Sequence, residues 1–142
     1  MTTVRHLLNR KGSQVYSIDA EDPVLEAIQL MADRHVGALV VMRGLELVGI
    51  VSERDYARKV ILLGRSSSET PVWQIMSSPV ITVTPDRTVN DCMRTVTENR
   101  IRHLPVTEQG RVVGMISIGD LVKAVIEEQQ QTIEQLESYI HR

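Results

Sequence analysis

The chain has 142 residues, of which 42% are apolar and 24% charged, a composition typical of a folded domain rather than a disordered segment. Its 16 basic and 18 acidic residues leave a net charge of −2, which gives no electrostatic reason to expect nucleic acid or an anionic membrane as a partner. No apolar run approaches the roughly 20 residues that span a bilayer, and no signal-peptide pattern is present. A single cysteine, Cys92, cannot form an internal disulfide, so we expect a cytoplasmic protein.

The first structural pattern lies in residues 15–63 and has the order β-α-β-β-α. Its first helix is amphipathic, because apolar residues recur at positions i, i+3, i+4 and i+7 from Val24, and two strands in hairpin register follow it. The expected elements are a strand (15–18), a turn at Asp22-Pro23, the amphipathic helix, two hairpin strands (38–42 and 47–51) and a closing helix (about 54–63).

Residues 80–126 repeat this pattern. When the sequence is shifted by 65 positions, residues 15–61 align with 80–126 without a gap, ten of the 47 positions are identical, and the apolar pattern repeats in phase. The expected elements are a strand (80–83), an amphipathic helix from Val89, two hairpin strands (103–107 and 111–116) and a helix from about 120.

These patterns predict an α/β (α+β) fold of two pseudo-symmetric β-α-β-β-α repeats with a C-terminal helical extension. A lone unit of about 50 residues would expose much of its sheet, so we expect the repeats to pack sheet to sheet. In the connector, Trp73 is expected to anchor the segment to the core. The expected boundaries are an N-terminal segment (1–14), the first repeat (15–63), the connector (64–79), the second repeat (80–126) and the C-terminal extension (127–142).

A short block at the end of each hairpin is also duplicated. It reads Gly49-Ile50-Val51-Ser52-Glu53-Arg54-Asp55 in the first copy and Gly114-Met115-Ile116-Ser117-Ile118-Gly119-Asp120 in the second. The two glycines are expected to allow close approach of backbone. With the repeated hairpins, these blocks resemble the signature of the tandem CBS-domain pair, the Bateman module. The resemblance implies a regulatory module that binds an adenine nucleotide such as AMP, ADP, ATP or NAD between its repeats and commonly associates as a dimer.

Ser52-x-x-Asp55 and Ser117-x-x-Asp120 each lie between a strand and a helix, and two interpretations stay open. In the first, each pair is a capping box that closes the helix N-terminus. In the second, the serine and the free N–H groups of the helix bind phosphate. The CBS resemblance implies that Asp55 and Asp120 then accept hydrogen bonds from the ribose hydroxyls, which suits a carboxylate with two oxygens.

The resemblance also implies which residues frame the ligand. The residues expected around Asp120 are Val15, Tyr16, Val36, Gly37, Ala38, Met115 and Gly119. Those expected around Asp55 are Ile50, Arg54, Val80, Ile81 and Ile101. Arg102 and His103 could reach either phosphate, although a solvated Arg102 and a simply packed His103 are the alternatives. The segments at the start of the two hairpins are unequal, because residues 36–38 are small and neutral while residues 101–103 are bulkier and basic.

We expect no catalytic residues and no metal site. The four histidines show no metal-ligand spacing, and there is no second cysteine to join Cys92, which falls on the apolar face of a helix. No nucleophile elbow and no P-loop pattern is present. The favoured function is a nucleotide sensor that regulates an unidentified partner protein. The alternative is a dimeric scaffold whose nucleotide sites are vestigial.

The C-terminal segment carries a heptad pattern. Its narrow apolar stripe predicts pairing with another helix and hence a homodimer, whereas folding back on its own domain is the alternative. The residues of this seam, spaced alternately by three and four positions, are Ile126, Gln129, Ile133, Leu136 and Ile140.

Overall fold

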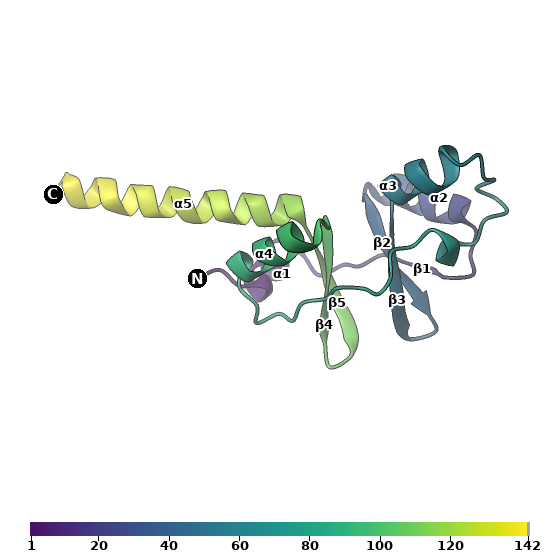
Figure 1. Ribbon diagram of the computed structural model, residues 1–142. Helices are drawn as coiled ribbons and strands as arrows, with labels where there is room; N and C mark the ends of the chain where they lie inside the picture. The colour runs from purple at the N-terminus through teal and green to yellow at the C-terminus, as the bar shows by residue number, and fades with distance from the viewer. Residues whose placement is uncertain (142) are drawn as a thin grey trace. The chain divides into compact units, whose positions relative to one another are not determined.

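The computed structural model describes residues 1–141 and shows two compact units, each of which contains one copy of the repeat (Figure 1). The first-repeat unit comprises residues 15–81, and so includes the connector. The second-repeat unit comprises residues 1–14 and the chain from residue 82 onward. The N-terminal segment therefore packs with the second copy, although it precedes the first copy in the sequence.

The first-repeat unit is a three-stranded sheet covered by helices. Strand β1 lies parallel to β2, which pairs antiparallel with β3 so that Ala38 faces Ser52. Val24, Ala27 and Met31 bury one face of α2 against the sheet, as their spacing predicts. The elements are β1 (Ser17–Asp19), α2 (Val24–Arg34), β2 (Ala38–Arg43), β3 (Glu46–Ser52), α3 (Glu53–Tyr56), the π-helical turn η1 (Ala57–Ile61) and the 3₁₀ turn η2 (Val72–Gln74).

The second-repeat unit has the same order of helices and hairpin strands, with β4 and β5 antiparallel and His103 facing Ser117. Its α4 buries Val89, Cys92 and Val96, so the predicted packing role of the cysteine is confirmed. The elements are α1 (Val4–Lys11), α4 (Val89–Asn99), β4 (His103–Glu108), β5 (Arg111–Ser117) and α5 (Ile118–Ile140).

The strand predicted at 80–83 does not form, and the prediction is wrong there. Only Val83 pairs, in an isolated parallel bridge with Val106. In the first repeat, Val40 N donates to Tyr16 O at 3.2 Å and extends the ladder. The equivalent residue in the second repeat is Pro105, which has no N–H to donate, so the ladder loses this bond.

Each unit is completed by a segment that fills the space beside its hairpin glycine. Leu8 of α1 lies against Gly114, and Met76 after η2 lies against Gly49. These glycines thus make room for neighbouring side chains, whereas the sequence analysis expected close approach of backbone. In the connector it is Val72 and Ile75 that are fully buried, whereas the side chain predicted to anchor this segment, Trp73, is 44% exposed.

The last helix, α5, is buried only at its start, where Leu121 and Ala124 contact the core of the second-repeat unit. It extends well beyond α1 and α4 (Figure 1). Residues 129–141 are all exposed, so the alternative in which this helix folds back on its own domain is not what the structure shows.

Candidate functional site

The first Ser–Asp pair lies at the junction between β3 and α3. Asp55 N donates to Ser52 Oγ at 3.2 Å, while Asp55 Oδ2 accepts from Ser52 N at 3.0 Å and from Ser52 Oγ at 3.1 Å. The other oxygen, Oδ1, lies 3.2 Å from the ammonium of Lys59, which also donates to Ile75 O at 2.9 Å. The Asp55 side chain is only 13% exposed, and both of its carboxylate oxygens have partners.

The second pair lies at the junction between β5 and α5 and repeats the same geometry. Asp120 N donates to Ser117 Oγ at 3.1 Å, and Asp120 Oδ2 accepts from Ser117 N at 2.8 Å. The same oxygen accepts from the ammonium of Lys11 at 2.6 Å, and Lys11 also donates to Met115 O at 2.8 Å. Among the described residues, Asp120 Oδ1 has no partner, and the side chain is 26% exposed.

The charge state of Asp120 follows from these contacts. Burial raises the pKa of the Asp120 carboxyl, but hydrogen bonds from the Lys11 ammonium and from Ser117 outweigh burial, so this pKa lies below its usual value. Asp120 is therefore an anion that can only accept hydrogen bonds at neutral pH.

Both pairs form the capping boxes described as one of the two interpretations above. Capping and ligand binding are compatible, because a carboxylate has about four lone-pair sites and the capping bonds use only part of this capacity. The remaining capacity differs between the sites, since Oδ1 is engaged by Lys59 at Asp55 and open at Asp120.

Two lysines belong to these sites and were missed by the sequence analysis. Lys59 could have been found, because it lies four residues after Asp55 on the same helical segment. Lys11 carries no such signal, because 109 residues separate it from Asp120. The sequence position equivalent to Lys59 in the second repeat is Ala124.

The segments before β2 and β4 are held against the starts of the helices. Glu53 N donates to Gly37 O at 3.1 Å, and Ile118 N donates to Arg102 O at 2.8 Å. Gly37 is exposed and Ala38 is buried, whereas the bulkier Arg102 is exposed. The exposed side chain fits the solvated alternative for Arg102.

The other predicted framing residues are half-buried or exposed. The Tyr16 ring lies 5.3 Å from the Arg34 guanidinium carbon, and Ile50 exchanges backbone hydrogen bonds with Ser77 at 2.8 and 3.1 Å. A Cβ on Gly119 would meet only Ser117 Oγ at 3.6 Å. The half-buried members are Val15, Tyr16, Val36, Ile50, Val80, Ile81, Ile101, His103 and Met115, and Arg54 is exposed.

These framing residues are divided between the units. Met115 lies in the same unit as Asp120, and Lys11 donates a hydrogen bond both to the Met115 carbonyl and to the Asp120 carboxylate. Residues 15–16 and 36–38 belong to the first-repeat unit. Ile50, Arg54, Val80 and Ile81 belong to the unit of Asp55, and Ile101 to the other. Their assembly around one ligand stays a prediction.

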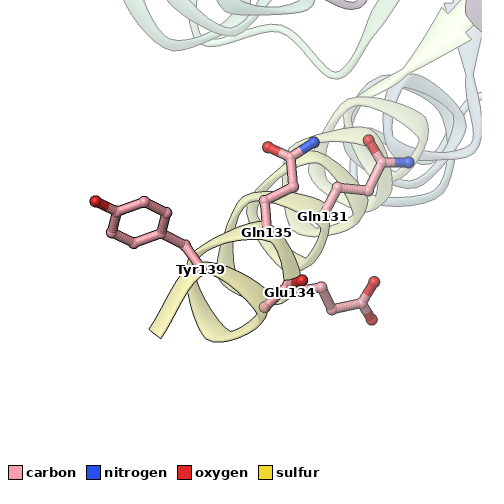
Figure 2. Close-up of a pocket in the computed structure, with 5 residues that line it drawn as sticks. Gln131, Glu134, Gln135 and Tyr139 are labelled. Atoms are coloured by element: carbon pink, nitrogen blue, oxygen red, sulfur yellow. The ribbon is translucent and has the colours of Figure 1, made fainter. Parts of the chain in front are cut away.

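A cavity of about 110 Å³ lies beside Asp120, between α1 and α5. It is lined by Leu7, Arg10, Lys11, Asp120, Lys123, Ala124 and Glu127. A larger space of about 550 Å³ along the last turns of α5 is the open surface of one exposed helix, from which Gln131, Glu134, Gln135 and Tyr139 project (Figure 2). The first cavity includes a predicted site residue, and the second does not.

The CBS domain family model matches residues 4–62 and 72–127. The matched ranges cover both repeats together with α1 and η2. The chain is 41% identical to the CBS domain-containing protein CBSX3, mitochondrial, of Arabidopsis thaliana over 98% of this chain and 72% of that protein. It is 31% identical to the CBS domain-containing protein YhcV of Bacillus subtilis (strain 168) over 77% of each chain.

Solved structures show the same fold. The crystal structure of the CBS domain NE2398 aligns with a TM-score of 0.84 and 48% identity over 89% of this chain and 99% of that one. A protein with CBS domains from Burkholderia ambifaria MC40-6 aligns with a TM-score of 0.86 and 49% identity over 90% and 96% of the two chains. The fold is therefore that of a CBS-domain pair, of mixed α and β structure. This chain belongs to the CBS domain family and carries two CBS domains.

CBS-domain pairs are in general regulatory modules that bind adenosine-containing ligands. Among the described helices, none combines the length and apolar character needed to cross a membrane.

Proposed function

We propose that this chain is a regulatory module that binds an adenine nucleotide, of the AMP, ADP, ATP or NAD type, and signals to a partner protein through its conformation or assembly. The observation that carries the proposal is the duplicated Ser–Asp pair at a strand-to-helix junction. In both copies the aspartate is held in place by backbone and lysine contacts, and at Asp120 one oxygen is left open to a ligand.

The chemistry of these junctions suits a nucleotide. A carboxylate can accept hydrogen bonds from the two vicinal hydroxyls of a ribose, while the N-terminal end of a helix attracts phosphate through its N–H groups and dipole. Asp55 and Asp120 would bind ribose, and Ser52 and Ser117 would lie next to the phosphates. Apolar residues on either side would contact the adenine ring, and Arg102 offers a guanidinium for phosphate.

The first prediction concerns stability. Nucleotides that contain adenine should raise the melting temperature, because a ligand that binds only the folded state stabilises it, by about 2.7 kcal/mol at 100 times its Kd. Guanine and pyrimidine nucleotides should raise it less. The measurement is thermal unfolding of protein freed of bound nucleotide, with calorimetric titration of the same ligands.

A second function has a specific observation in its favour. Within the described part of the chain, the contacts of Asp55 and Asp120 are capping bonds and lysine ion pairs, which an internally satisfied scaffold would also contain. Absence of both a melting shift and binding heat with millimolar adenine nucleotides would establish this scaffold function in place of nucleotide sensing.

We also propose that the chain forms a homodimer. The support is the exposed seam of α5, where Ile126, Ile133, Leu136 and Ile140 are 47–73% exposed. Isoleucine occupies one heptad position of the seam at 126, 133 and 140, and Leu136 one of the two positions between them, a pattern that favours two-stranded coiled coils. A hexameric CBS-CP12 protein from bloom-forming cyanobacteria is a structural neighbour with a TM-score of 0.78 and 27% identity, so related folds do assemble. The cytoplasmic location remains part of this proposal, and the similar Arabidopsis protein is described as mitochondrial.

The second prediction tests this assembly. The full chain should be a dimer in multi-angle light scattering, and truncation after Glu128 should weaken association or change its geometry, because it removes most of the seam but no core residue. A full chain that is monomeric at micromolar concentration would refute the dimer. An unchanged dimer after truncation would place the interface on the helices of the repeats.

A further inference from the structure

We infer that Lys11 of α1 completes the ribose-binding site of the second repeat, donating a hydrogen bond to one hydroxyl while Asp120 Oδ1 accepts from the other. The inference rests on the proposed function and extends it to a residue that lies outside the duplicated motif. The N-terminal helix then forms part of the ligand site.

The contacts of the pair leave one donor and one acceptor side by side. An ammonium has three N–H donors, and Lys11 uses two of them, on Asp120 Oδ2 and on Met115 O. Asp120 Oδ2 accepts from Lys11 and Ser117 N, while Oδ1 has no partner among the described residues. An adjacent donor and acceptor match a vicinal diol, whose hydroxyls can each donate or accept.

The first repeat also places an ammonium on its aspartate, from a different part of the chain and on the other carboxylate oxygen, Oδ1. Lys59 also bridges the carboxylate, here of Asp55, and a backbone carbonyl, that of Ile75. The second repeat has Ala124 at the equivalent sequence position, and its ammonium comes from α1 instead. Because non-equivalent residues supply the same group to both aspartates, the ammonium is better explained as part of the site than as a chance surface ion pair.

A ligand can reach this pair. The Lys11 side chain is 38% exposed and the Asp120 side chain 26% exposed. The cavity of about 110 Å³ between α1 and α5 has both residues in its lining. The neighbouring Arg10 is paired with Glu127 at 2.7 Å, so Lys11 is the cation that α1 places on the carboxylate.

The test isolates the second site by using the full chain with Asp55→Asn as the background. Into this background Lys11→Met is introduced, and calorimetry compares AMP with 2′,3′-dideoxy-AMP, which lacks both hydroxyls. We expect Lys11→Met to lower the affinity for AMP about five- to twentyfold, as for loss of a charge-assisted hydrogen bond. The affinity for dideoxy-AMP should stay within about twofold. Lys11→Arg keeps a cationic donor and should restore part of the preference for AMP.

The matched control is Arg5→Met in the same background. Arg5 lies on the same helix and pairs with Asp86 and Glu108 at 3.3 and 3.2 Å. Its replacement therefore removes one positive charge and two ion pairs of α1 at a position that does not contact Asp120. Both ligands should bind this control as they bind the background protein. Thermal unfolding confirms that each variant is folded at the assay temperature.

Four results would overturn the inference. Equal weakening of both ligands by Lys11→Met would make Lys11 a structural or phosphate contact. Unchanged AMP affinity would remove Lys11 from the site, and tighter AMP binding would show that Lys11 blocks it. If the wild-type chain binds no adenine nucleotide, the proposed function fails, and the inference with it.

Discussion

Replacing either aspartate with asparagine should lower nucleotide affinity at that site about 10- to 100-fold. The substitution keeps the size and one acceptor oxygen but removes the charge, and charge-assisted hydrogen bonds contribute about 1.5–3 kcal/mol. We expect the larger loss for Asp120→Asn, because Oδ1 of Asp120 is open whereas both oxygens of Asp55 are engaged. The measurement is calorimetric titration of AMP into each single variant.

The control for this prediction is the stability of the two asparagine variants. An asparagine oxygen can still accept the capping bond but loses the ion pair with Lys59 or Lys11, so the variants should stay folded with a free energy of unfolding lowered by about 1–3 kcal/mol at each site. Wild-type protein should also prefer AMP to 2′-deoxy-AMP, and the asparagine variants should show less of this preference. Variants that bind AMP as tightly as wild type would restrict both aspartates to helix capping.

Gly114→Val should destabilise the second-repeat unit by about 1–3 kcal/mol, the usual cost of overfilling a packed site. A Cβ at this position would lie 2.6 Å from Leu8 Cδ2 and 2.9 Å from Leu8 Cδ1, so the buried Leu8 side chain must shift. Valine is otherwise favoured in a strand, so the loss would come from this contact. Urea unfolding measures the change.

Gly119→Ala is the matched control for this contact. The added Cβ would meet only Ser117 Oγ, at an ordinary 3.6 Å, and alanine is favoured over glycine in a helix, so stability should hold or rise. Because Lys11 lies on the same helix as Leu8, Gly114→Val should also weaken AMP binding at the Asp120 site. A Gly114→Val protein as stable as wild type would contradict the close packing of Leu8 on β5.

Much of the fold could be predicted from local spacing. The apolar periodicity of 24–31 and of 89–96 placed two helices, and alternation around two turns placed both hairpins within one or two residues. The sequence also contains the reason why no strand forms at 80–83, which is Pro105. The effect of this proline becomes apparent only by comparison with the first repeat, where the equivalent Val40 donates a backbone hydrogen bond to Tyr16.

The candidate site divides in the same way. The capping boxes of Ser52 with Asp55 and Ser117 with Asp120 involve residues three positions apart at a strand-to-helix junction, so the sequence alone determined that each carboxylate would face the start of its own helix. The sequence also shows that the Ser–Asp pair is duplicated, so the capping geometry of one site predicts that of the other.

Only the tertiary structure decided what these carboxylates meet. Lys11 reaches Asp120 across 109 residues because α1 packs on β5 through Leu8 and Gly114, and no spacing rule of helix or strand extends so far. The burial of Val72 and Ile75 in place of Trp73 is likewise a matter of which face the folded connector turns inward. Local patterns depend on a period of two to four residues, whereas these contacts depend on how distant segments fill the same space.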